Sequence, residues 1–197
     1  MKFDHKQLST TKGIKVNGPI LIKPKIFRDG RGFFFESWNQ LKFDEIIGQK
    51  ISFCQDNHSR SNIGVLRGMH YQLGPHSQGK LVRCTRGTIY DVAVDIRRSS
   101  KTFGKWGGVI LSDENKLQLW IPKGFAHGFL TLSETAEVQY KTDDFWDKDC
   151  ERSLKWNDKI LNINWPKNSN FKEPKLSKKD EEAPSFIDAK LKGEIFK

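Results

Sequence analysis

Short apolar and aromatic runs, separated by turn residues, occupy most of the chain between residues 14 and 142. The runs are rich in β-branched and aromatic residues, and Gly, Pro, Asn or Ser interrupts them at intervals of about 8 to 12 residues. This spacing is typical of strands that follow one another through tight turns. It predicts a mostly antiparallel β-sandwich or β-barrel.

One early helix and a change of texture near residue 150 complete the predicted architecture. Residues 39–50 (NQLKFDEIIGQK) carry an apolar stripe with helical spacing and a glycine at its end. The stripe consists of Leu41, Phe43, Ile46 and Ile47. We expect one domain over residues 1–197, with its β core at about 14–142 and C-terminal loops and short helices over 150–197.

Composition restricts the compartment and the partners. The three cysteines, Cys54, Cys84 and Cys150, are widely spaced without a CxxC pair, which favours a reducing compartment such as the cytoplasm. No apolar run approaches the ~20 residues that span a bilayer, and the start lacks a secretory signal. The net charge of +10 comes from scattered lysines without a nucleic-acid-binding motif. It indicates a solvated surface that can also attract an anionic ligand.

Charged residues interrupt the strand predicted at residues 65–72 (VLRGMHYQ). A regular strand would place Arg67 and His70 on opposite faces. Gly68 lies between them at a natural position for a β-bulge, which would direct both side chains into one cavity. On the next strand, Lys80 shares its face with apolar residues; it is either a solvated strand end or a cation aimed into the same cavity.

The stretch IPKGFAHGF (residues 121–129) resembles the second half of the cupin signature, in which a tight turn delivers a histidine into a small barrel. His127 is then either a packed core histidine or a site residue. Metal-binding cupins add two histidines and a glutamate from an earlier motif, but His70 is followed by Tyr71 and Gln72. Two imidazoles alone make a poor site for zinc or iron, so we expect no metal.

A site without a metal needs another role for its two histidines, its arginine and its lysine. This combination favours a phosphorylated substrate and acid–base chemistry. Arginine and lysine bind phosphate oxygens, and a histidine accepts a proton near neutral pH. The complementary acid is available in the strand EVQYKT, where Tyr140 points to the same side as Ala136 and Val138. Tyr140 is either that acid or a core residue.

Five ordered motifs resemble those of the dTDP-4-dehydrorhamnose 3,5-epimerases, which are RmlC-type cupins, and the resemblance runs from about residue 14 to 186. They are DGRGFFFESW, FCQDNHSRSNIGVLRGMHYQ, GKLVRCTRGTIYDVAVDIRRSSKTFGKW, LWIPKGFAHGFLTLSETAEVQYKT and WNDKILNINWP. The resemblance implies a cupin or jelly-roll β-barrel and a cofactor-free epimerase of nucleotide-linked 4-keto sugars. It also implies a homodimer in which an N-terminal strand lends residues to the neighbouring subunit's site.

The resemblance assigns roles to particular residues. It makes His70 the catalytic base, Tyr140 the general acid and Asp180 the carboxylate that pairs with the base. Asp180 also lies three residues after Ser177, so the residues alone equally allow a helix-start role. Further positions matched to substrate binding are Arg31, Glu36, Gln55, Asn57, Arg67, Lys80, His127, Glu151 and Lys179.

The chain departs from the family where a tyrosine pair normally contributes a ring that stacks on thymine. Phe145 and Trp146 stand there, and Trp146 can stack on a nucleobase, including a larger one. The favoured substrate is dTDP-4-keto-6-deoxyglucose, inverted at carbon-3 and carbon-5. The alternatives are epimerisation at carbon-3 only, a GDP-4-keto-heptose substrate, a 3,4-ketoisomerase, and a non-catalytic sugar-nucleotide-binding cupin.

Overall fold

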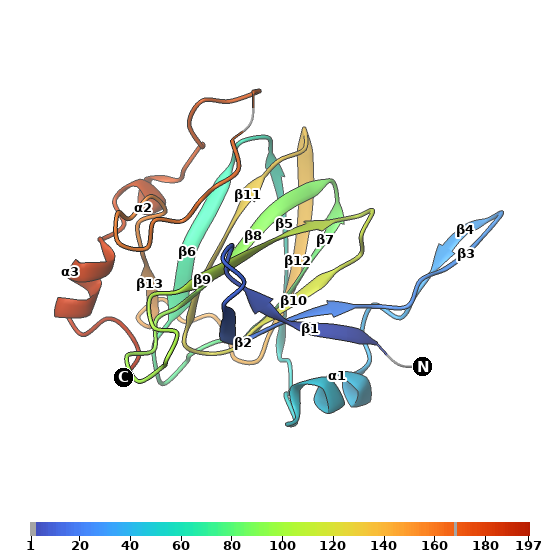
Figure 1. The fold of residues 1–197 in the computed structure, drawn as a ribbon, viewed down its shortest axis with the longest axis horizontal. Coiled ribbons are helices and arrows are strands. Elements are labelled where there is room, and N and C mark those ends of the chain that lie inside the picture. Colours follow the sequence, from blue (N-terminus) through green and yellow to red (C-terminus); the bar gives the residue numbers. More distant parts are fainter. Residues whose placement is uncertain (1–2, 168) are drawn as a thin grey trace.

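Two antiparallel sheets build the body of the molecule in this computed structural model, which describes residues 3–167 and 169–197 (Figure 1). The larger sheet contains, in spatial order, β1 (Asp4–Ser9), β2 (Lys15–Lys23), β10 (Gln118–Ile121), β7 (Lys80–Arg86), β12 (Thr135–Thr142) and β5 (Gln55–Asn62). The smaller sheet contains β13 (Glu151–Ser153), β6 (Leu66–Gln72), β11 (Phe125–Thr131), β8 (Thr88–Asp95) and β9 (Trp106–Ser112). This order is that of a cupin jelly roll, so the predicted fold class is confirmed.

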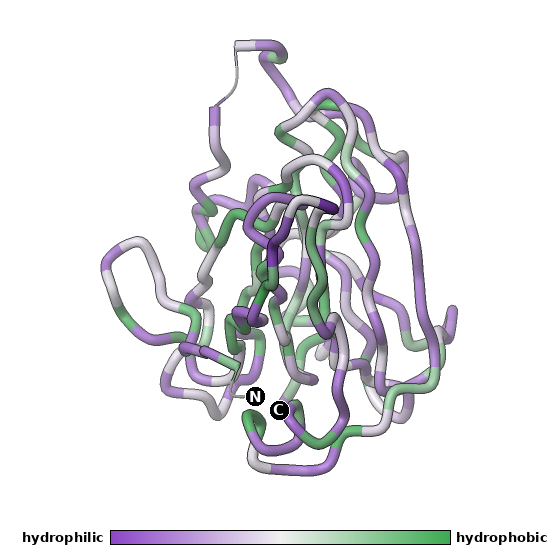
Figure 2. The backbone as a smooth tube through the Cα atoms, turned by 90° about the vertical axis from the view of Figure 1, so that its right-hand side faces the viewer, coloured by the Kyte–Doolittle hydropathy of each residue, from purple (hydrophilic) through white to green (hydrophobic). Residues whose placement is uncertain are grey.

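The inner faces of the two sheets meet in one apolar core. Residues from both sheets alternate along their strands so that every second side chain enters this core. The central members are Val82, Ile89, Leu111, Leu119, Phe129 and Val138. Figure 2 shows the apolar segments running through the interior strands, whereas hydrophilic segments dominate the outer loops.

Helices and loops cover the outer face of each sheet. The C-terminal segment, with α2 (Lys178–Glu181) and α3 (Phe186–Leu191), packs on the smaller sheet. The early helix forms as α1 (Gln40–Ile47), and Phe43 packs on the larger sheet beside Trp120. The predicted stripe was wrong for Leu41, which is 82% exposed, because α1 is short and only part of its circumference faces the sheet.

The strands extend beyond the predicted range of about 14–142 at both ends. β1 precedes that range, and β13 follows it in a segment predicted to contain only loops and helices. Both are edge strands with polar sequences (DHKQLS and ERS) that hydrogen bond to β2 and β6 through the backbone. Edge strands need no apolar alternation, which is why the sequence pattern missed them.

A two-stranded arm projects away from the sheets (Figure 1). It consists of β3 (Phe27–Asp29) and β4 (Gly32–Phe34), and neither strand pairs with the other sheets. Phe33 and Phe34 on this arm are 52% and 69% exposed. Successive strand residues point to opposite faces, so the arm presents one large apolar side chain on each face.

Candidate active site

A β-bulge at Gly68 sets the geometry of the site. Along β6 and β11, His70 pairs with His127 but Arg67 pairs with Phe129, so β6 holds one extra residue between the two pairs. Leu66 and Met69 are buried outside the barrel, whereas Arg67 and His70 both line its cavity. The predicted bulge is confirmed, and it explains why one strand can present both charged side chains to the same space.

Gly68 can occupy the bulge because it lacks a side chain. Its φ of +139° lies in a region that other residues rarely adopt, and an added Cβ would lie 2.5 Å from the Cα of Gly128 on β11. We expect Gly68→Ala to destabilise the protein by at least about 2 kcal/mol, because backbone strain and steric overlap add. Urea unfolding measures this change. Gly74→Ala, in open space on the following loop, is the matched control, and equal stability of the two variants would contradict the argument.

The inner cavity has a volume of about 230 Å³ and lies between the two sheets. It gathers six of the predicted site residues from five strands, which places cations, imidazoles and a phenol around one small space. These residues are Asn57, Arg67, His70, Lys80, His127 and Tyr140. Within residues 3–167 and 169–197, no group of three or more His, Cys, Asp or Glu side chains is placed to hold a metal ion.

His70 is held by a buried carboxylate from the C-terminal segment. Its Nε2 lies 2.6 Å from Oδ1 of Asp180, whose residue is only 3% exposed. Burial raises the pKa of Asp180. The hydrogen bonds from His70 and Ser177 together lower it by more than burial raises it, so the net shift is downward. An ionised carboxylate only accepts, so Nε2 carries a proton, and the neutral imidazole then has its free lone pair on Nδ1. His70 is therefore arranged as a base.

Asp180 lies in the first turn of a helix and also contacts His70, through different atoms. Ser177 is the N-cap of α2, and its hydroxyl accepts from the backbone N–H of Asp180. The side chain of Asp180 leaves the helix and contacts His70. A carboxylate in the first turn also lies favourably toward the helix N-terminus.

A second buried carboxylate, Asp91, was not predicted as a site residue. Its Oδ1 lies 2.6 Å from Nε2 of His127, and the residue has no exposed surface. Its Oδ2 accepts no hydrogen bond from the described part of the chain. A signal existed in the sequence, since Asp91 alternates in phase with the core residues Ile89 and Ala93 on β8. Both faces of this strand are buried along most of its length.

Burial changes the acidity of the cation and the phenol in the cavity. It lowers the pKa of Lys80 to about 8, against the opposing effect of the charges on Glu151 and Asp91. It raises the pKa of Tyr140, with the charge of Arg67 acting in the opposite direction. Lys80 Nζ lies 6.0 Å from the centre of the Tyr140 ring. Near neutral pH the cavity thus holds a charged ammonium beside a protonated phenol.

At the mouth of the cavity, side chains link the strands to the Trp146 loop, defined as residues 143–147. Gln55 donates to Asn57 Oδ1 at 3.0 Å and accepts from the backbone N–H of Trp146 at 3.0 Å. Arg67 lies there as well, exposed and donating to Ser61 Oγ at 2.9 Å. The predicted positions Gln55, Asn57 and Trp146 are therefore linked by hydrogen bonds, and Arg67 lines the cavity together with Asn57.

The other predicted binding residues divide into two groups. Glu151 and Lys179 form an ion pair of 2.6 Å, and the charge of Glu151 reaches Lys80 and Tyr140. Arg31 and Glu36 do not line the cavity: Arg31 pairs with Asp29 at the tip of the projecting arm, and Glu36 pairs with Lys42. A single chain therefore does not bring the last two residues to the site.

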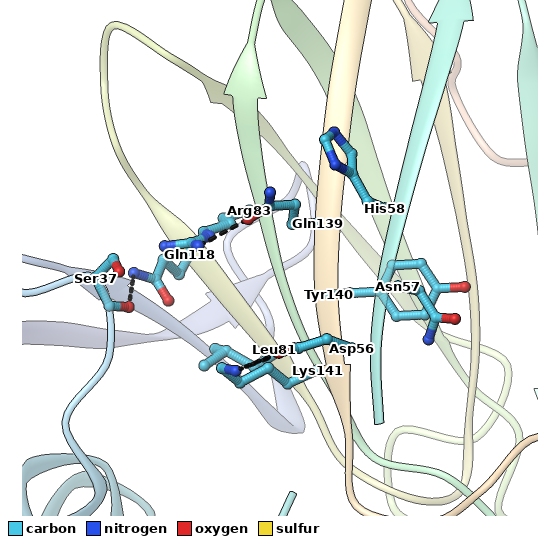
Figure 3. Close-up of a pocket in the computed structure, with 10 residues that line it drawn as sticks. All are labelled: Ser37, Asp56, Asn57, His58, Leu81, Arg83, Gln118, Gln139, Tyr140 and Lys141. Carbon is cyan, nitrogen blue, oxygen red and sulfur yellow. Dashed lines mark hydrogen bonds and ion pairs between the residues drawn. The ribbon is translucent and has the colours of Figure 1, made fainter. Parts of the chain in front are cut away.

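A separate pocket of about 170 Å³ lies on the other side of β12 (Figure 3). Tyr140 and Asn57 project from one face of the strands, whereas Arg83, Gln118 and Lys141 project from the opposite one (Figure 3). Arg83 donates to Gln139 Oε1 at 2.7 Å. This arrangement confirms that Tyr140 faces inward with the apolar set of β12.

A jelly-roll barrel that holds a carboxylate-bound imidazole, a half-buried lysine and a phenol defines the class of a cupin-type acid–base enzyme for an anionic substrate. The family model for dTDP-4-dehydrorhamnose 3,5-epimerase matches residues 13–188. The dTDP-4-dehydrorhamnose 3,5-epimerase of Shigella flexneri is 58% identical over 170 residues, which is 86% of this chain and 92% of that protein.

Solved structures that resemble this chain are also sugar-nucleotide epimerases. The Legionella pneumophila dTDP-6-deoxy-D-glucose-3,5-epimerase, in complex with dTDP-4-keto-L-rhamnose, has a TM-score of 0.85 and 46% identity, covering 95% of this chain and 97% of that one. A 3′-monoepimerase from Streptomyces bikiniensis, in complex with dTDP-quinovose, has a TM-score of 0.84 and 33% identity, covering 90% and 88%.

The chain belongs to the dTDP-4-dehydrorhamnose 3,5-epimerase family. It is thus an isomerase of the epimerase type, and the predicted family and enzyme class are confirmed. In residues 3–167 and 169–197 there is no helix long and apolar enough to cross a membrane.

Proposed function

We propose that this protein inverts carbon-3 and carbon-5 of dTDP-4-keto-6-deoxyglucose, and that residues 1–197 act as a single cupin-type domain without a cofactor. The observation that carries the proposal is the His70–Asp180 pair, which opens onto the same cavity as Tyr140 and Lys80. High identity to epimerases named for dTDP-linked sugars supports the nucleotide and the sugar.

The chemistry begins at a carbon next to the ketone. His70 takes the proton from one face of that carbon, the C–H electron pair moves into an enolate, and negative charge develops on the ketone oxygen. Tyr140 then donates a proton to the opposite face of the carbon, which inverts the centre. Solvent returns the proton from His70 to the tyrosinate, so the net reaction consumes nothing.

The remaining groups stabilise charge and hold the substrate. Lys80 neutralises the developing enolate, and stabilising such charge usually lowers the barrier more than any other single effect in an enzyme. Asp180 keeps His70 in one tautomer and stabilises the imidazolium that forms. Arg67 binds the diphosphate at the mouth, and Trp146, which is 55% exposed, stacks on the nucleobase. The other members of the binding set are Gln55, Asn57, His127, Glu151 and Lys179.

The active form is a homodimer with N-terminal exchange. The projecting arm of β3 and β4 exposes Phe33 and Phe34 and carries Arg31 at its tip, away from the cavity of its own chain. In a second copy, this arm would supply Arg31, and the segment that follows it would supply Glu36, to the neighbouring site. Three unpaired thiols support a cytoplasmic, reducing location.

Two alternative reactions keep the same base and acid. The similarity to the 3′-monoepimerase structure supports inversion at carbon-3 alone. The exposed ring of Trp146 would also stack on the larger base of a GDP-4-keto-heptose. A 3,4-ketoisomerase and a non-catalytic sugar-nucleotide-binding cupin are less well supported. The former moves the carbonyl and the latter needs no base, whereas His70 is held ready by Asp180.

Deuterium incorporation tests the reaction directly. We expect incubation with dTDP-4-keto-6-deoxyglucose in deuterated water to place two deuterons on the sugar, because each inverted carbon exchanges one proton with solvent. Mass spectrometry counts the deuterons and proton NMR assigns them to carbon-3 and carbon-5. One deuteron at carbon-3 would establish the single-centre alternative. An unlabelled sugar would refute this substrate and direct the test to GDP-linked 4-keto sugars.

A further inference from the structure

The Trp146 loop combines exposed rings with a fixed backbone. Phe145 and Trp146 are 62% and 55% exposed, so the loop presents two large aromatic side chains to solvent. Its backbone is nevertheless hydrogen bonded at every residue from 143 to 147. Surface loops are generally more mobile than the strands and helices they connect. An anchored loop with an exposed indole indicates that the position of the ring matters.

Gln72 supplies the central anchor. It ends β6 two residues after His70, and it is only 3% exposed. Its Nε2 donates to the carbonyl of Phe145 at 3.1 Å, and its Oε1 accepts from the backbone N–H of Asp147 at 2.9 Å. One buried amide thus holds the backbone on both sides of Trp146.

The loop that follows β6 strengthens this anchor from outside. Gln72 also donates to the carbonyl of His76, which ties the loop at residues 73–79 to the same amide. Gln78 Nε2 donates to the carbonyl of Asp144 at 2.8 Å, and the His76 ring lies 3.2 Å from the carboxylate of Asp144. The two loops are therefore hydrogen bonded to each other, and Gln72 is the buried group that joins both to β6.

We infer that Gln72 is a positioning residue that fixes the nucleobase-stacking ring of Trp146 relative to the catalytic base. This inference rests on the proposed role of Trp146. His70 and Gln72 belong to one rigid strand, so β6 sets the separation between the reacting carbon and the nucleobase. Gln72 then controls nucleotide affinity while leaving proton transfer unchanged.

The experiment compares dTDP binding and turnover in Gln72→Met, which keeps the length and packing of the side chain but removes its hydrogen bonds. We expect the Kd for dTDP, measured by calorimetry, to rise about 10-fold, within the range of a lost base–aromatic stack. The kcat at saturating substrate should stay near the wild-type value. Gln40→Met, which removes one hydrogen bond within α1 and one to the carbonyl of Ile51 in the loop after that helix, is the matched control with unchanged Kd.

The double variant with Trp146→Ala separates positioning from general damage. If Gln72 acts through the indole, Gln72→Met adds no further loss of affinity once Trp146 is alanine. Unchanged dTDP affinity in Gln72→Met, alongside weakened affinity in Trp146→Ala, would overturn the inference and leave the stacking role intact. Unchanged affinity in Trp146→Ala would overturn both, while deuterium incorporation still reports the epimerase reaction.

A second variant keeps the inference testable if Gln72→Met does not fold, as judged by thermal unfolding. Gln78→Ala removes the hydrogen bond to the carbonyl of Asp144 from the outer side of the same loop. It should raise the Kd for dTDP by a smaller factor and again leave kcat unchanged. A fall in kcat with an unchanged Kd in this variant would contradict the assignment.

Discussion

His70→Asn should abolish solvent-proton exchange into the sugar and reduce kcat by about 10³–10⁴, at the upper end of what a general base contributes. The amide can still donate to Asp180, which keeps that buried carboxylate paired and preserves the fold. It has no basic lone pair near neutral pH, so it cannot accept the carbon-bound proton. Mass spectrometry in deuterated water measures the exchange, and calorimetry with dTDP measures binding.

Nucleotide binding in His70→Asn should stay close to wild type, because the stacking ring and the diphosphate contact lie on other residues. His5→Asn changes the same residue type on the exposed strand β1 and should retain full exchange. Tyr140→Phe provides the opposite comparison: it should slow inversion while leaving part of the exchange at the base. Normal exchange combined with weak dTDP binding in His70→Asn would refute the base assignment.

The inward positions of the site could be predicted from strand alternation. Lys80 and Tyr140 each lie in phase with apolar residues on their strands, and both face the cavity. Gly68 indicated the shared orientation of Arg67 and His70. A bulge can form at a glycine between two charged strand residues and reverse the alternation of the strand there. Helix ends could also be predicted from local residue types: Ser177 caps the start of α2, and Gly48 caps the end of α1.

The parts that could not be predicted depend on distant backbone pairing. β13 is a strand only because β6 leaves a free edge beside it, and nothing in the letters ERS favours a strand. The Asp180–His70 contact joins residues 110 positions apart, so spacing alone left a helix-start role equally open. Asp91 was not predicted as a site residue, because a polar residue on a strand usually faces solvent, whereas both faces of β8 are covered.

Lys80→Met should reduce kcat by about 10²–10³, the usual consequence of removing one group that stabilises an oxyanion. The same change should raise the melting temperature, because a lysine whose pKa falls to about 8 is one whose charge the fold disfavours. Methionine has a similar length and fills the space without a charge. Activity and thermal unfolding measured on the same samples at pH 7 test both effects.

The pH profile of the wild type follows from the direction of this shift. Lys80 is charged below pH 8 and loses its proton above it, so the rate should fall as pH rises through about 8. The unfolded chain keeps that proton up to the ordinary lysine pKa of about 10.4, so this group makes the fold more stable as pH rises between the two values. Lys80→Arg keeps a cation throughout this range and should move the fall in rate to higher pH. An unchanged fall in the arginine variant would show that another group causes it, and full activity of Lys80→Met would remove the lysine from the mechanism.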